Sequence, residues 1–129
     1  MKTSDFVARV RERGGIESSE EAIKASRATL MILSERLKGG EPMHLASQLP
    51  REIARFLHTE NAGLGRRLSI DEFVRRISEL EGVDMETARE HARTVIEVLY
   101  EAVSEGEMDD VVAQLPESYQ RLFGPHWRH

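Results

Sequence analysis

An internal repeat constrains the fold of this chain more than any other feature of its sequence. The segment Asp5–Val10 returns in the second half of the chain as Glu72–Ile77, and Leu49-Pro50 returns as Leu115-Pro116. The offset between the copies changes by one near residues 17–21, a polar stretch in which a single insertion has little effect on a fold. A register that holds at apolar positions and slips once in a loop indicates a duplicated unit.

Each repeat unit is expected to contain four helices. Ser69 and Glu72 form a capping-box pattern at the start of one helix, and Gly39-Gly40 and Gly106 are expected to end the two long helices. Pro50 suits the first turn of a helix, where its missing N–H needs no acceptor. The expected helices span about 4–13, 19–38, 41–48 and 50–58 in the first unit and 69–81, 84–104, 107–114 and 116–123 in the second.

The pattern of apolar residues predicts an all-α fold. Apolar residues cover roughly half the circumference of helices 19–38 and 84–104, which should therefore be central. No window alternates as a half-buried strand would. We expect a single domain, 1–129, of about eight helices. In it two pseudo-symmetric units, about 4–58 and 69–123, share one core, with a linker at 59–68, in which Gly63-Leu64-Gly65 is expected to be flexible, and a tail at 124–129. The expected core residues are Leu30, Leu33, Leu37, Leu49, Ile53, Ile77, Ile96, Leu99, Val103, Leu115 and Leu122.

Composition narrows the classes of function. The chain has 129 residues, a net charge of -5 and no cysteine, which excludes disulfides, cysteine nucleophiles, thiolate zinc sites and iron–sulfur clusters. Its longest apolar run, Leu30–Leu33, is too short to cross a membrane, and the N-terminus lacks the apolar stretch of a signal peptide. We therefore expect a cytoplasmic protein that does not bind membranes.

Three motifs together resemble a known family. They are Asp5-Phe6-Val7 near the start, Leu33 with Arg36-Leu37 in a long helix, and the segment Gly40–Pro50, whose Gln-Leu-Pro recurs at Gln114–Pro116. The chain from about residue 5 to 123 resembles the bacterial domain-of-unknown-function family 2267 (DUF2267). The resemblance implies a small helical prokaryotic domain with no established activity and supplies no catalytic residues.

No catalytic or metal-binding pattern is evident in the sequence. Glu41 and His44 have the Glu-x-x-His spacing of di-iron bundles, but such sites need a second copy, and the equivalent residues 107–110 contain no histidine. The sequence contains neither a Gly-x-Ser-x-Gly elbow nor a phosphate-binding glycine loop. We therefore expect no catalytic residue, no metal and no cofactor, and we favour a non-enzymatic role while leaving the question open.

Basic residues gather in two related places, which raises nucleic-acid binding as a possibility. The second half of the chain is acidic and few aromatic residues lie near the basic ones, so the sequence argues against this function. The basic residues are Arg9, Arg11 and Arg13 in the first unit and Arg66, Arg67, Arg75 and Arg76 in the second.

Protein interaction is the function that the sequence favours, with a homo-oligomer or an unidentified protein as partner. Phe123 and Trp127 are the candidate partner-binding residues, because a lone exposed Trp can anchor a partner. We nevertheless favour the interpretation that Trp127 folds back beside Phe123 and does not contact a partner.

The alternative is a small-ligand-binding protein or enzyme that uses a cleft between the units, with Arg36, His44, Gln48 and Gln114 as candidates. Of these, Gln48 and Gln114 are expected to hydrogen-bond free backbone groups at helix corners rather than a ligand. A polar pocket between the units would favour this alternative, and a continuous apolar patch would favour a protein partner.

Overall fold

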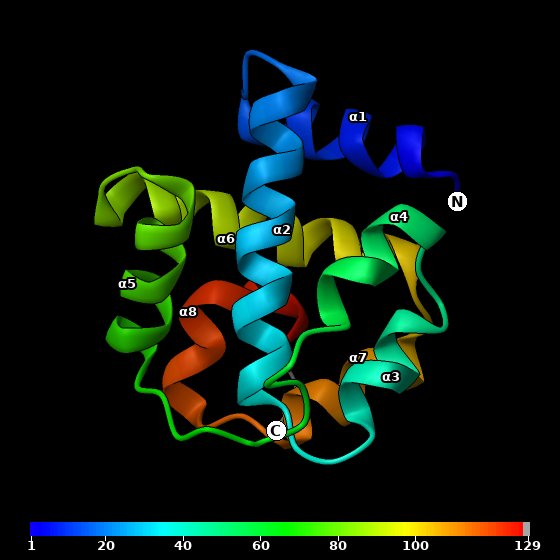
Figure 1. Cartoon of the computed structure of the whole chain (residues 1–129), viewed down its shortest axis with the longest axis vertical. Helices are drawn as coiled ribbons and strands as arrows, with labels where there is room; N and C mark the ends of the chain where they lie inside the picture. Colours follow the sequence, from blue (N-terminus) through cyan, green and yellow to red (C-terminus); the bar gives the residue numbers. More distant parts are fainter. Residues whose placement is uncertain (128–129) are drawn as a thin grey trace.

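The computed structural model describes residues 1–127, and this part of the chain forms eight α-helices and three short 3-10 helices (Figure 1). Arg128 and His129, at the end of the expected tail, lie outside the described residues. No strand occurs within residues 1–127, and the predicted all-α class is confirmed. The α-helices are α1 (Thr3–Gly14), α2 (Ser19–Arg36), α3 (Glu41–Ala46), α4 (Arg51–Ala54), α5 (Ile70–Glu81), α6 (Met85–Ala102), α7 (Glu105–Ala113) and α8 (Gln120–Phe123). The 3-10 helices are Arg55–Leu57, Glu117–Tyr119 and Gly124–His126.

Helices α2 and α6 are central, as the breadth of their apolar surface predicts. Figure 1 shows α6 crossing behind α2, with α1 above, α5 on one side and α4 on the other. Both α1 and α5 pack against both long helices, α3 packs against α7, and α8 packs against α6. Every residue of the predicted core is buried, and all of them belong to one cluster that draws on both sequence repeats.

The helices repeat in length and spacing. Helices α1 and α5 have 12 residues each, and α2 and α6 have 18 each. The Ser69 hydroxyl accepts from the N–H of Glu72 at 3.1 Å, and the Glu72 carboxylate accepts from the N–H of Ser69 at 3.2 Å, which confirms the predicted capping box. The pseudo-twofold relation between the units stays a prediction that superposition of residues 4–58 on 69–123 tests.

The ends of the long helices differ from the prediction. Helix α2 ends at Arg36 and α6 at Ala102, each slightly early, because Leu37 and Val103 adopt an extended backbone and turn into the core. Gly106 does not end α6. It lies inside α7, which begins after Ser104, whose hydroxyl accepts from the N–H of Glu107 at 3.1 Å.

The segment between the two repeats is held in place and is not the flexible linker that its glycines suggest. Gly63 donates its N–H to the carbonyl of Ser34 at 2.9 Å, and its own carbonyl accepts from Gly39 at 2.8 Å. Gly65 donates to Leu37 at 3.0 Å. The segment therefore covers the carbonyl end of α2 and satisfies groups that a helix end leaves unpaired.

None of the helices within residues 1–127 is both long enough and apolar enough to cross a lipid bilayer.

Candidate functional site

Two reciprocal hydrogen bonds join the repeats. Gln48 accepts the backbone N–H of Ser104 through Oε1 at 2.7 Å, and Gln114 accepts that of Lys38 in the same way, also at 2.7 Å. Gln48 and Gln114 are equivalent positions of the two repeats, as are Lys38 and Ser104. The predicted hydrogen-bonding role of the glutamines holds, but each one reaches across to the other repeat instead of its own helix corner.

Ion pairs also occur at equivalent positions of the two repeats. They join α1 to α6 and α5 to α2. Arg9 pairs with Glu101 at 2.9 Å, and the repeat-equivalent Arg76 pairs with Glu35 at 3.0 Å. Arg13 also pairs with Glu101 and, at 3.3 Å, with Glu97. The two equivalent ion pairs differ in exposure to solvent. Glu35 is only 5% exposed, whereas the Arg9–Glu101 pair lies at the surface.

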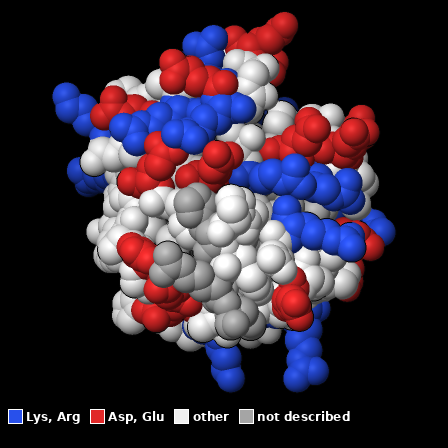
Figure 2. Space-filling model, turned by 180° about the vertical axis from the view of Figure 1, so that it is seen from behind, with Lys and Arg blue, Asp and Glu red and all other residues white. Residues whose placement is uncertain are grey.

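These pairs account for much of the basic cluster that the sequence suggests. Arg9, Arg13, Arg66 and Arg76 each form an ion pair with a glutamate carboxylate. Figure 2 shows Lys and Arg side chains lying next to Asp and Glu side chains over the upper part of the face it presents. Mixed charge of this kind is typical of a solvated surface held by ion pairs.

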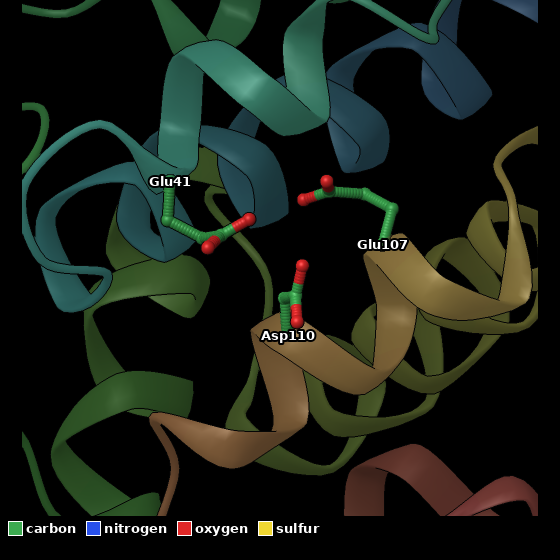
Figure 3. Close-up of side chains that lie close together, drawn as sticks. All are labelled: Glu41, Glu107 and Asp110. Carbon is green, nitrogen blue, oxygen red and sulfur yellow. The ribbon is translucent and has the colours of Figure 1, made fainter.

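A cluster of three carboxylates lies where α3 packs against α7. Glu41, Glu107 and Asp110 each place one oxygen within 4.8 Å of the others, and Figure 3 shows the side chains converging on one space. Glu107 is 7% exposed, Glu41 is half-buried and Asp110 is exposed. The Oε2 atoms of Glu41 and Glu107 are both buried without a hydrogen-bond partner among the described residues.

This environment disfavours the ionised form of Glu107. Burial raises the pKa of Glu107 to about 8, and the hydrogen bond and charge of Glu41, together with the charge of Asp110, act in the same direction. The raised pKa favours the protonated form of Glu107 near neutral pH, and in that form Glu107 can donate a hydrogen bond to Glu41.

Sequence reasoning missed the cluster although a signal for it exists. Glu41 and Glu107 occupy equivalent positions of the two repeats, each directly after a glycine, so they are a repeated acidic residue. If the two units pack around a twofold axis, equivalent residues near that axis must meet. His44, the other half of the Glu-x-x-His pattern, is exposed and is not part of the cluster.

A second feature, an open hollow of about 370 Å³, lies between the repeats. Its lining residues are Arg36, Lys38, Gly65 and Gln114. Two of the four residues expected in an inter-unit cleft, Arg36 and Gln114, thus come together, whereas His44 and Gln48 do not line it. The Arg36 guanidinium lies 5.6 Å from the centre of the Tyr119 ring, and its Nε is buried without a hydrogen-bond partner in the described part of the chain.

Trp127 folds back beside Phe123, as expected from the sequence. Its ring packs edge-on against Phe123, with ring centres 5.9 Å apart, and Trp127 is half-buried against the core. Phe123 itself is 2% exposed. The partner-binding role of these two residues stays a prediction.

Comparison with known proteins agrees with the resemblance found in the sequence. The family described as "Uncharacterized conserved protein (DUF2267)" matches residues 3–122. A search of curated proteins finds no match. Because the match covers nearly all of the 129 residues, the chain belongs to the DUF2267 family.

Proposed function

We propose that the chain is a ligand-binding protein that takes a small anionic molecule in the hollow between the repeats. The observation that carries this proposal is the lining of the hollow. Arg36 and Lys38 supply positive charge, and none of the described residues that line it is acidic. A guanidinium and an ammonium that line the same hollow suit a carboxylate or phosphate group.

The geometry of the donors supports the same ligand class. The Oε1 of Gln114 is already occupied by the N–H of Lys38, so the amide NH₂ is the part of this side chain left to donate to a ligand. Arg36 lines the hollow as well and carries a guanidinium, whose N–H groups can donate to a carboxylate or phosphate. A hollow of about 370 Å³ falls within the range of small-molecule sites.

A protein partner, the function that the sequence favours, has less support. The large exposed apolar side chains among the described residues are spread along the chain. They are Met1, Ile23, Met43, Leu64 and Leu80. Trp127, the expected anchor, is engaged with Phe123. An adaptor or homo-oligomer role therefore remains an expectation from the sequence.

Thermal unfolding with phosphate or citrate as the probe tests the proposal. We expect either anion at millimolar concentration to raise the Tm of the natural protein, because a ligand that binds only the folded state stabilises it. Lys38→Gln should abolish most of that rise. Lys24→Gln removes the same charge from an exposed position of α2 outside the hollow, and should leave the rise unchanged.

Two results would contradict the proposal. One is an anion-dependent rise in Tm that Lys38→Gln and Lys24→Gln reduce equally, which would indicate a general effect of charge. The other is the absence of any rise with a panel of small carboxylates and phosphates.

A further inference from the structure

We propose that Glu41, Glu107 and Asp110 form a binding site for a hard divalent cation of the Ca²⁺ type between α3 and α7. This site is separate from the hollow, and the inference does not depend on the function proposed above. Its basis is the convergence of three carboxylates, within 4.8 Å of one another, from two helices that contact each other (Figure 3).

Burial distinguishes this cluster from acidic residues that merely share a surface. Glu107 is 7% exposed, and its Oε2 is buried with no hydrogen-bond partner within the described chain. Figure 3 shows this side chain extending from α7 toward the carboxylates of Glu41 and Asp110. A buried carboxylate oxygen without a donor is costly, and coordination of a cation relieves that cost. Protonation of the carboxylate relieves it as well.

The type of donor selects the type of cation. All three groups supply oxygen only, which suits Ca²⁺, Mg²⁺ and Mn²⁺ better than zinc or copper. Three oxygens spread evenly around one Ca²⁺, each at about 2.3–2.6 Å from it, lie roughly 4.0–4.5 Å from one another. The three carboxylate oxygens lie within 4.8 Å of one another, so small movements of the side chains would bring them around one Ca²⁺. Mg²⁺ would require them to approach to roughly 3.6 Å or less.

The number of carboxylates in the site also predicts its affinity for Ca²⁺. Three carboxylates fill only part of the six to eight positions around Ca²⁺, so water or another ligand would complete the shell. We expect a Kd of roughly 0.1–1 mM, the range of weak, partly open calcium sites. Because α3 and α7 come from different repeats, a bound cation would link the two halves of the chain.

Asp110→Asn is the informative variant, because Asp110 is exposed and its replacement should leave the fold intact. Isothermal titration calorimetry with CaCl₂ at constant ionic strength should give a Kd for Asp110→Asn that is at least roughly tenfold weaker than that of the natural protein. Asp109→Asn removes the same charge from the neighbouring exposed position of α7, which is not part of the cluster. It should leave the Kd within about twofold.

A second readout uses stability. CaCl₂ at about 10 mM should raise the Tm of the natural protein and of Asp109→Asn by roughly 4 °C more than it raises that of Asp110→Asn. MgCl₂ should have a smaller effect. Glu107→Gln, which retains the shape of the side chain, should also lose calcium binding while remaining folded by circular dichroism.

Equal binding by Asp110→Asn and Asp109→Asn would overturn the inference, since it would mean that calcium responds only to overall charge. Failure of the natural protein to bind Ca²⁺, Mn²⁺ or Mg²⁺ would overturn it as well, and would indicate that the cluster is neutralised by a proton alone.

Discussion

The side chain of Gln114 accepts the backbone N–H of Lys38 at 2.7 Å across the boundary between the two sequence repeats. Lys38 lies just beyond the end of α2, where the backbone has left the helix and its N–H needs an acceptor. The equivalent hydrogen bond from Ser104 to Gln48 satisfies the corresponding position after α6. The repeated Gln-Leu-Pro motif therefore has a structural use at both of its occurrences.

Replacing Gln114 with Ala should lower the free energy of unfolding by about 1 kcal/mol, the typical net contribution of one hydrogen bond with a neutral side chain. Urea denaturation followed by circular dichroism measures the change. Gln120→Ala, at an exposed position of α8, should change it by less than about 0.5 kcal/mol. Equal values for the two variants would mean that the hydrogen bond between Gln114 and Lys38 contributes nothing to stability.

The two equivalent ion pairs should differ in strength. Arg76→Met removes one ion-pair partner from the buried carboxylate of Glu35. Arg66, at 3.8 Å, is the partner that remains among the described residues. The variant should therefore be destabilised by about 2 kcal/mol. Arg9→Met breaks an exposed pair and should cost about 0.5 kcal/mol. Chemical denaturation of both variants gives the comparison. A larger effect for Arg9→Met would show that burial of Glu35 is not the deciding factor.

Two glycine substitutions should have opposite effects. Gly63 has a φ of +82°, and a Cβ placed there would overlap the carbonyl oxygen of Gly39, so Gly63→Ala should destabilise by at least about 1–2 kcal/mol. Gly106 lies in the first turn of α7, where an added methyl group would meet no other described residue, so Gly106→Ala should stabilise by up to about 1 kcal/mol. Thermal and urea unfolding of the two variants should therefore move in different directions, and movement in the same direction would contradict this explanation.

His91 should titrate above its usual range. Its Nδ1 lies 2.6 Å from Oε1 of the buried Glu81, and this hydrogen bond raises the pKa of His91 despite partial burial. Because the pKa is higher in the folded state, the pair contributes fully to stability below about pH 6.5, and the contribution is lost as the pH rises through the raised value. Proton NMR of the imidazole measures the pKa. Glu81→Gln should lower it, whereas Glu79→Gln, an exposed position of the same helix, should not.

Glu107 should make the protein less stable at alkaline pH. Its pKa of about 8 in the folded state exceeds the ordinary 4.5, so its stabilising contribution is complete at low pH and is lost as the pH rises toward and through 8. With EDTA present, Glu107→Gln should match the natural protein near pH 5 and become more stable than it near pH 9. If the difference in free energy of unfolding between the two proteins is the same at both pH values, the raised pKa of Glu107 is contradicted.

The sequence by itself determined the helices and the core. Apolar periodicity depends on neighbouring residues, and prolines and the capping-box residues act on the backbone within one turn, so the all-α class, the central long helices and the burial of Leu33 or Ile96 could all be predicted locally. The same local rules failed at Leu37 and in the glycine-rich linker, where burial of a side chain or a hydrogen bond to a distant carbonyl outweighed the local preference. They failed at Gly106 for a local reason, because Ser104 caps the start of α7 two residues earlier.

Only the tertiary structure decided which side chains meet between the repeats. The repeat makes Glu41 and Glu107 equivalent positions, but it does not fix how α3 lies on α7 or how close the two carboxylates come. The burial of Glu107 beside Glu41, the raised pKa of Glu107 and the position of Gln114 and Arg36 in the lining of one hollow all follow from the packing of the helices. Electrostatic interactions and coordination depend on distances of a few ångströms, which the folded core sets and the order of residues does not.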